Sequence, residues 1–314
     1  MRTRPTDAHR LEYEQRVNRV IDHVRDHLAD ELSLAGLARV AAFSPFHFHR
    51  VFTAVTGETL FGFIQRLRIE RAAVALSLHA ERSVLAVALD HGFTSAAGFA
   101  RAFRARFGMS ASAWRDGGAR RWRRRHHPDR KPGKVIRKAG KARRASPRDP
   151  RRMTTAMGVR IVQAPPYHVA YMRHVGPYGT HGIPALWARL GRWMQGRAIG
   201  PEGRITLGIA YDDPAVTAAE HCRYDACVVV PPDFAPDRAV NLMDVAGGTY
   251  AVGTFVGAAH EITGVWDRVF ATWLPGSGWQ PDDRPCFELY RGDPTVDEKA
   301  GSFRCDLLLP VRPL

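Results

Sequence analysis

Glu288 is the residue of the C-terminal half whose surroundings point most directly to ligand chemistry. Strand alternation places Cys286, Glu288 and Tyr290 on one face of a segment, with Phe287 and Leu289 on the other. A carboxylate among apolar and aromatic side chains is costly unless a cation or a hydrogen-bond donor reaches it. The pattern therefore predicts a binding site for a small cationic or aromatic molecule. The alternative is a glutamate at a sheet edge that is hydrogen-bonded locally.

Aromatic residues elsewhere in this half would complete such a site. The faces of aromatic rings attract organic cations, with about 0.5–2 kcal/mol for each contact. The residues that we expect to contact the ligand are Glu288, Tyr290, Tyr211, Trp187, Trp266 and Tyr171. For the two tryptophans the alternative is a place in the hydrophobic core, because both occur at helical spacing.

An internal repeat indicates the elements that position these residues. Trp187 and Trp266, Tyr211 and Tyr290, and the segments 228–231 and 307–310 each match at an offset of 79 residues. Each copy reads as strand, helix, strand, strand, with helices over about 184–195 and 260–274. Two such units predict an α+β domain with an antiparallel sheet and a groove near the pseudo-two-fold axis. In this alignment Ile209 takes the place of Glu288 in the first copy.

The N-terminal half is predicted to be helical, and it also repeats itself. Apolar residues recur at helical spacing over 17–28, and Ser33 is a plausible N-cap of a short second helix. After a break at 42–43, a further helix runs from Ser44 to about Thr56. A short helix, a tight turn and a second helix form the helix-turn-helix pattern.

Five identical residues show the second copy of this pattern at an offset of 51 residues. Ser44, Phe48, Arg50, Phe52 and Gly57 recur as Ser95, Phe99, Arg101, Phe103 and Gly108. The apolar spacing between the copies predicts one long connecting helix. Two units held by a rigid helix could place their recognition helices in successive major grooves, about 34 Å apart.

The positive charge is concentrated between the two halves. The chain has 314 residues and a formal net charge of +15, and residues 120–152 contain 16 Lys and Arg against two acidic residues. Such a stretch repels itself and cannot form a core. We therefore expect a DNA-binding domain over 10–116, a basic flexible linker over 117–156 and a ligand-binding domain over 157–314. The linker is either a solvated spacer or an arm that binds DNA phosphates through counterion release.

Other kinds of site are not indicated. The four cysteines form no C-x-x-C pair and are expected to be buried thiols in a reducing cytosol. His23 and His27 lie four residues apart without a third ligand, so no metal is expected. No stretch approaches the roughly 18 apolar residues that a membrane-spanning helix needs, and no secretory signal is recognised. We expect a cytoplasmic protein without a cofactor or membrane contact.

The run from about Val17 to Arg115 resembles the AraC/XylS-type DNA-binding domain, through "SPFHFHRVFTAVTG", "RIERAAVAL" and "HGFTSAAGFARAFRARFG". The resemblance implies that Phe46, His49 and Arg50 contact bases, and Arg50 could pair with guanine, worth about 1–3 kcal/mol of discrimination. A salt-bridged or phosphate-bound arginine is the alternative. The second recognition helix departs from the family pattern with Ala96, Ala97 and Gly98. We expect it to supply fit and backbone contacts, with the contacting residues Ala96, Ala97, Arg101 and Arg104.

Residues 158–314 resemble the GyrI-like effector-binding domain, through "YMRHVGPYG", "GIAYDDP", "RYDACVVVP", "CFELYRGDP" and "CDLLLPV". The resemblance implies a ligand-binding role for Glu288, since in several relatives an acidic residue at this strand position binds cationic or aromatic effectors. The combination of domains implies a transcription regulator of multidrug or stress response that binds double-stranded DNA and a small effector, contacts RNA polymerase and is not an enzyme.

Two alternatives stay open. In the first, Glu288 and Tyr290 hydrolyse a strained, cyclopropane-type electrophile, with the carboxylate orienting or deprotonating water. In the second, the C-terminal domain is a protein-binding modulator, for example of gyrase or polymerase. A DNA-repair alkyltransferase is disfavoured, because no cysteine is followed by histidine.

Overall fold

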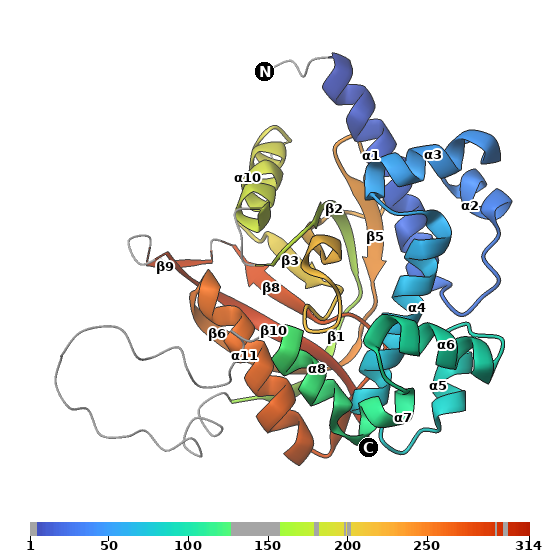
Figure 1. Cartoon of the computed structure of the whole chain (residues 1–314). Coiled ribbons are helices and arrows are strands. Elements are labelled where there is room, and N and C mark those ends of the chain that lie inside the picture. Colours follow the sequence, from blue (N-terminus) through green and yellow to red (C-terminus); the bar gives the residue numbers. More distant parts are fainter. Residues whose placement is uncertain are drawn as a thin grey trace. The chain divides into compact units, whose positions relative to one another are not determined.

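A computed structural model describes residues 5–126, 158–178, 182–197, 199, 202–292, 294–297 and 301–314 (Figure 1). Two compact units divide the chain: unit 1 consists of Met1–Pro128, Ala215–Ala218 and Ala235–Asn241, and unit 2 consists of Asp129–Pro214, Ala219–Phe234 and Leu242–Leu314. Most of the predicted linker, from residue 127 to its end at 156, lies outside the described residues.

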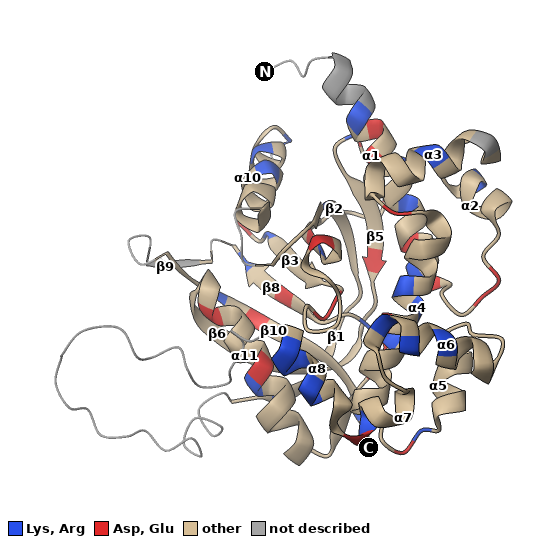
Figure 2. Cartoon of the chain, in the orientation of Figure 1, with Lys and Arg blue, Asp and Glu red and all other residues tan. Residues whose placement is uncertain are grey.

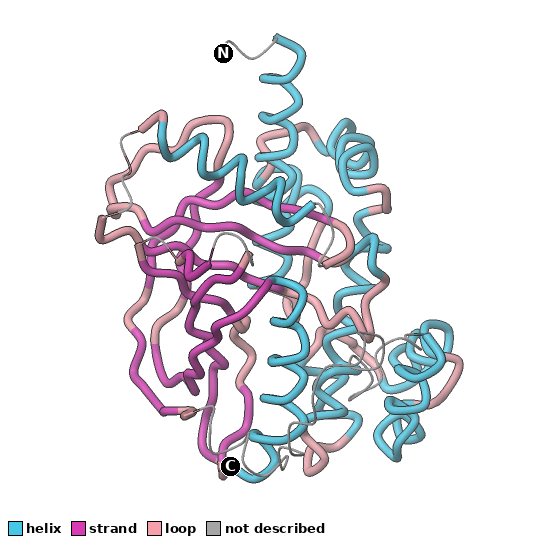
Figure 3. Tube along the Cα trace, turned by 90° about the vertical axis from the view of Figure 1, so that its left-hand side faces the viewer, coloured by secondary structure: helices cyan, strands magenta, loops and turns pink. Residues whose placement is uncertain are grey.

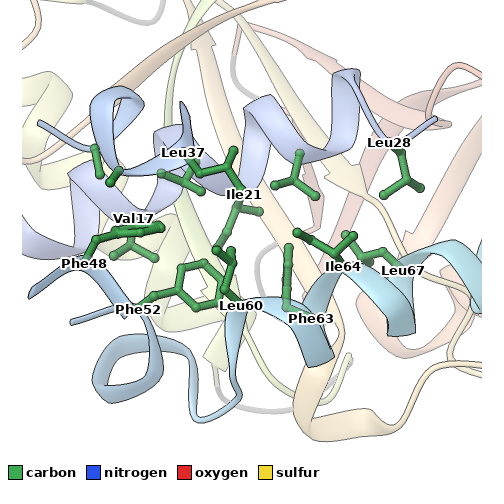
Figure 4. Packing of buried hydrophobic residues seen from close by; sticks show 14 residues of the cluster. Val17, Ile21, Leu28, Leu37, Phe48, Phe52, Leu60, Phe63, Ile64 and Leu67 are labelled. Atoms are coloured by element: carbon green, nitrogen blue, oxygen red, sulfur yellow. The ribbon is translucent and has the colours of Figure 1, made fainter. Parts of the chain in front are cut away.

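Unit 1 begins with the first helix-turn-helix. Its elements are α1 (Pro5–Asp26), α2 (Leu34–Val40) and α3 (Pro45–Thr56). The Ser33 hydroxyl accepts a hydrogen bond from the amide of Gly36 at 3.1 Å, as its sequence position predicts for an N-cap. Figure 4 shows the core that joins these helices, in which Phe48 and Phe52 of α3 meet apolar residues of α1 and α4.

The second helix-turn-helix follows the connecting helix α4 (Leu60–Leu78). It consists of α5 (Val84–Asp90) and α6 (Ala96–Phe107), each capped by a serine hydroxyl, Ser83 and Ser95. Phe99 and Phe103, the counterparts of Phe48 and Phe52, are buried against α4 and α5. The predicted duplication of one packing unit is therefore confirmed.

Three short helical segments extend unit 1 beyond this pattern. They are α7 (Ala111–Ala113), a π-helical turn (Trp114–Gly118) and α8 (Ala119–His126). The sequence analysis placed residues 119–126 in a flexible linker, whereas the structure forms a helix there. Trp122 is the reason, because its ring packs against Phe107 and Trp114 at centroid distances of 5.2 and 6.1 Å.

Unit 2 is built on a curled antiparallel sheet, drawn in magenta in Figure 3. Its main strands are β1 (Arg160–Ala164), β2 (Tyr167–Val175), β3 (Ile205–Ala210), β4 (Arg223–Val229), β5 (Asn241–Val245), β6 (Gly248–Ala258), β8 (Phe287–Arg291) and β10 (Ser302–Pro313). Their spatial order is β1-β6-β10-β8-β3-β4-β2-β5. The short strands β7 (Trp279–Pro281) and β9 (Thr295–Asp297) both pair with β10.

The two copies of strand, helix, strand, strand are present as predicted. The first consists of β2, α10 (Gly182–Gln195), β3 and β4, and the second of β6, α11 (Ala259–Arg268), β8 and β10. α11 continues through a π-helical turn (Val269–Trp273) and a 3₁₀ turn (Leu274–Gly276), and a second 3₁₀ turn (Ala219–His221) precedes β4. The copies meet where β3 pairs with β8.

One detail of the predicted repeat is wrong. The register of β3 and β8 places Gly208 opposite Glu288 and Ile209 opposite Phe287. Residues that lie directly opposite each other in an antiparallel pair point to the same face, so Gly208, and not Ile209, shares the face of Glu288. A shift of one residue moves a side chain to the other face of a sheet. The offset of 79 therefore matches residues of β3 and β8 that lie on opposite faces of the sheet.

Candidate DNA-reading helices and carboxylate site

The first recognition helix, α3, separates an inward from an outward face. Phe48 and Phe52 are fully buried, while His49 and Arg50 are exposed on the other side. His47 is exposed as well, and its ring nitrogen Nδ1 lies 3.0 Å from the Ser44 hydroxyl. Phe46 belongs to α3, but its side chain lies outside the described residues. The sequence analysis thus assigned the faces of this helix correctly for the positions that the structure describes.

The second recognition helix, α6, has a different outward face. Ala97, Ala100, Arg101 and Arg104 follow one another at helical spacing and are exposed. Ala96 is exposed at the start of the helix. Small side chains therefore occupy the first turns of α6, and arginine occupies the last turns. Figure 2 shows the basic residues of unit 1, among them those of α6 and α8.

The carboxylate site in unit 2 is a group of five side chains: Glu288, Tyr290, Tyr224, Trp187 and Trp266. The hydroxyl groups of Tyr290 and Tyr224 donate hydrogen bonds to Oε2 of Glu288 at 2.8 and 3.0 Å. The indole nitrogen of Trp187 donates to the Tyr224 hydroxyl at 3.2 Å. We call this group the carboxylate site.

Burial controls the electrostatics of the carboxylate site. Only 9% of Glu288 is exposed, and this burial raises its pKa above the ordinary value of 4.5, although hydrogen bonds from Tyr290, Tyr224 and Trp266 oppose the change. The pKa values of Tyr224 and Tyr290 are raised well above 10.0, first by burial and then by the charge of Glu288. Both tyrosines therefore act as hydrogen-bond donors at neutral pH. A cation beside this carboxylate would stabilise its buried negative charge.

The two tryptophans belong to the helices that pack on this face of the sheet. Trp187 of α10 and Trp266 of α11 are half-buried, and the Trp187 ring meets Tyr290 edge-on at 5.4 Å. A hollow of about 210 Å³ lies between β6 and α11, where Phe255 and Val265 line it. Both residues belong to the same apolar cluster as Tyr290. The hollow therefore lies beside the apolar cluster that contains Tyr290.

Tyr211 and Tyr171 do not join the carboxylate site, so the structure does not bring them together with Glu288 in the way that the sequence predicts. Both pack in a separate cluster on the opposite face of the sheet. The guanidinium group of Arg173 lies 5.0 Å from the Tyr171 ring and 5.4 Å from the Tyr211 ring. Arg223 lies 5.6 Å from Tyr211. For Tyr211 the reason is the strand register, because the offset of 79 matches it with Tyr290 on the other face of the sheet.

Tyr224 and Gly208 also belong to the surroundings of Glu288, and neither is predicted from the sequence. Tyr224 lies within the quoted motif "RYDACVVVP", but its role depends on the pairing of β3 with β4, which places Ala210 opposite Tyr224. Gly208 leaves the space that the Tyr224 hydroxyl occupies, since a Cβ atom there would lie 2.0 Å from this oxygen. The alternation of residues along one strand predicts which side chains share a face of the sheet. It does not predict which strands lie next to it, or which of their residues face it.

The histidines and cysteines that the structure describes form no group suited to a metal ion. The His23 and His27 rings are 4.3 Å apart, and no group of three His, Cys, Asp or Glu side chains among the described residues could hold a metal ion. Cys222, Cys227, Cys286 and Cys305 are free thiols, and burial raises the pKa of Cys286 to about 12. The helices that the structure describes include none with the length and apolarity to span a bilayer.

Comparison with known proteins assigns both halves. Residues 157–312 match the GyrI-like small molecule binding domain, and residues 37–117 match a helix-turn-helix domain. A DNA gyrase inhibitor of Enterobacter lignolyticus (strain SCF1) is 33% identical over 132 residues, which are 41% of this chain and 82% of that protein. The HTH-type transcriptional regulator YbfP of Bacillus subtilis (strain 168) is 33% identical over 103 residues, 33% of this chain and 35% of that protein.

The chain belongs to the AraC-type transcriptional regulators with a GyrI-like domain. The DNA-binding domain of AdpA, a global transcriptional factor solved with a target DNA, is similar to part of this regulator at 27% identity. The match covers 36% of this chain and 96% of that chain, with a TM-score of 0.31. In the regulator, α8 begins at Ala119, directly after the helix-turn-helix match ends at residue 117.

Proposed function

We propose that this regulator reads a DNA operator mainly through α3 and responds to a small cationic aromatic effector at the carboxylate site. The observation that carries the DNA-binding part is the outward face of α3, where His49 and Arg50 are exposed over a buried phenylalanine core. A bidentate arginine contact to guanine contributes about 1–3 kcal/mol of discrimination. α6 supplies fit and phosphate contacts through Arg101 and Arg104.

The experiment begins with the genomic fragments that the purified full chain retains at moderate salt. On the strongest fragment, Arg50→Ala should lower the affinity 5- to 150-fold, the change that corresponds to about 1–3 kcal/mol, and should leave thermal stability unchanged. Arg39→Ala, in α2 of the same helix-turn-helix, is the matched control. Equal loss of affinity on a random duplex would make Arg50 a phosphate contact, and unchanged operator affinity would remove it from the interface.

The effector part rests on the buried Glu288 and its two tyrosine donors. A cation would neutralise the carboxylate, and the rings of Trp187, Trp266 and Tyr290 would contact its aromatic part. Calorimetry with benzyltrimethylammonium and its uncharged isostere neopentylbenzene separates charge from shape. We expect wild-type protein to prefer the cation and Glu288→Gln to lose that preference. If neither compound binds, the carboxylate site is not an effector site of this class.

A second candidate function comes from the relatives named as gyrase inhibitors, which match the GyrI-like half. Such a role would need a protein partner for unit 2 and no effector. A supercoiling assay with purified gyrase tests it, since inhibition by the full chain would favour this function. Hydrolysis of a strained electrophile at Glu288 remains a prediction with its own test, turnover that Glu288→Gln abolishes. Contact with RNA polymerase likewise remains a prediction.

A further inference from the structure

Helix α8 is a basic helix that is anchored to the core of the second helix-turn-helix. Trp122 contacts Phe107, the last residue of α6, and the Trp122 ring stacks on His126 at 3.6 Å. Two glycines direct the chain into this position. Gly117 has a φ of +91°, and a Cβ atom on Gly118 would lie 2.4 Å from the Ala113 carbonyl oxygen. The path of α8 is therefore set by close packing.

The two sides of α8 differ sharply in chemistry. Successive residues of an α-helix are about 100° apart around its axis. Ala119, Trp122 and His126 therefore lie on one side, which is the side that contacts the core. Four exposed arginines occupy an arc of about 140° on the other side: Arg120, Arg121, Arg124 and Arg125. No acidic residue occurs within α8.

In the absence of a partner, the like charges of this arginine face repel one another and destabilise α8. Arg120 and Arg124, and likewise Arg121 and Arg125, are like charges four residues apart, and each such pair destabilises a helix by about 0.2–0.5 kcal/mol. Among the described residues, the recorded ion pairs include none with these four arginines. A polyanion that binds along the arc would remove the repulsion.

We propose that the arginine face of α8 binds the phosphate backbone of duplex DNA next to the segment that α6 contacts. The proposal rests on the proposed function in one respect, namely that α6 enters the duplex. The major groove is about 12 Å wide and its walls are the two phosphate backbones. A helix in ring contact with the end of α6 is therefore held close to one of these walls. Arginine suits this role, because its planar fork pairs with phosphate oxygens.

The salt dependence of binding to a random-sequence duplex tests this contact without knowledge of the operator. Each phosphate contact contributes about 0.9 to the slope of log K against log salt. In the full chain, changing the four arginines to Gln should lower the magnitude of the slope by roughly 2–4. Changing them to Lys should preserve the slope, because the charge is retained. Gln at Arg192, Arg291, Arg304 and Arg312, which are exposed in unit 2, removes the same net charge and should also preserve it.

Two results would overturn the proposal. The first is a slope that falls equally in the α8 and unit 2 Gln variants, since net charge alone would then explain it. The second is an unchanged slope together with weaker binding of poly-L-glutamate, which would assign α8 to an acidic protein. Failure of the proposed function would look different, because wild-type protein would then not prefer its retained genomic fragments over the random duplex. That comparison does not depend on α8.

Discussion

Gly208 lies directly opposite Glu288 on the neighbouring strand, and its missing side chain is what allows the carboxylate site to form. A Cβ atom on Gly208 would lie 2.0 Å from the Tyr224 hydroxyl oxygen and 2.8 Å from Oε2 of Glu288. The Tyr224 hydroxyl occupies the space above Gly208 and donates to Glu288 at 3.0 Å. The two strand-helix-strand-strand copies thus join at the pair of β3 with β8, where Glu288 faces a glycine.

Gly208→Ala should break this arrangement. The methyl group displaces the Tyr224 hydroxyl, so the variant loses the Tyr224–Glu288 hydrogen bond and gains strain, at a combined cost of about 1–3 kcal/mol. Denaturant unfolding of the full chain measures the loss. Gly191→Ala on α10 is the control, because nothing lies within 4 Å of its Cβ position, and it should stabilise the helix or leave it unchanged. Equal stability of the two variants would contradict the close packing at Gly208.

Glu288→Gln should make stability less dependent on pH. Because burial raises the pKa of Glu288, the folded protein holds this proton more tightly than the unfolded chain does. The stabilising effect of the proton is complete below the ordinary value of 4.5 and is lost as the pH rises through the raised value. Each unit of difference between the two pKa values corresponds to about 1.4 kcal/mol. Gln keeps the shape and lacks the charge.

Melting temperatures of the two proteins at a series of pH values from 4 to 8 give the comparison. The melting temperature of Glu288→Gln relative to that of wild type should rise with pH and then level off. Glu220→Gln, at an exposed carboxylate, serves as the control and should show no such trend. A wild-type protein that becomes the more stable of the two as the pH rises would mean that the carboxylate is compensated in the free protein.

The turns of the two helix-turn-helix units should respond in opposite ways to the exchange of Ala and Gly. Ala42 has a φ of +53°, in the left-handed region, while Gly92 has a φ of +79° in the corresponding turn. Ala42→Gly should stabilise unit 1 by about 0.5–1 kcal/mol, since it relieves the strain of a Cβ atom there. Gly92→Ala should destabilise it by more than this amount, because its Cβ would lie 2.7 Å from the Leu28 carbonyl oxygen.

Chemical denaturation of the two variants, with helix content as the signal, measures whether each substitution raises or lowers the free energy of unfolding. If Ala42→Gly destabilises the protein, the entropy of the unfolded glycine outweighs the strain and the turn is not strained in solution.

Glu70 should be essential to the second helix-turn-helix. This residue of α4 is only 4% exposed, and its carboxylate pairs with Arg66 at 3.2 Å and with Arg106 of α6 at 2.9 Å. Breaking a fully buried pair costs about 3–5 kcal/mol, and we expect a smaller loss here because Arg66 keeps its pair with Glu58 and Arg106 is partly exposed. Glu70→Ala should therefore lower the free energy of unfolding by several times more than Glu81→Ala, which alters an exposed carboxylate. Similar losses would show that the network contributes little.

The duplicated helical unit and the positions of Trp187, Trp266 and Tyr290 could be predicted from the sequence, because each depends on spacing along one element. Phe48 recurs as Phe99, each four residues after the serine at the N-cap position of its helix. The buried and exposed faces of these helices therefore follow from helical periodicity alone. Tyr224 was missed and Tyr211 was misplaced because both depend on strand register. The match of Tyr211 with Tyr290 joins residues on opposite faces of the sheet, and only the pairing of β3 with β8 reveals this.

Helix α8 shows a different limit. Its arginines dominate the composition and indicate a self-repelling segment, which is why residues 119–126 were assigned to the linker. In the structure, Trp122 in ring contact with Phe107 and the buried Ala119 join the segment to the core. The composition of a segment hides the contribution of one such tryptophan, whereas the packing of the segment on the core depends on it.

The most direct test of the account is the effect of an organic cation on DNA affinity. Thermodynamic linkage requires that an effector that changes operator affinity bind with different strength to the free and DNA-bound protein. Operator affinity should be measured with increasing benzyltrimethylammonium, for wild type and Glu288→Gln, against sodium chloride of equal ionic strength. The account predicts that benzyltrimethylammonium changes the operator affinity of the wild type by more than sodium chloride does. For Glu288→Gln it predicts that the two salts have the same effect. Identical curves for the two proteins would contradict it.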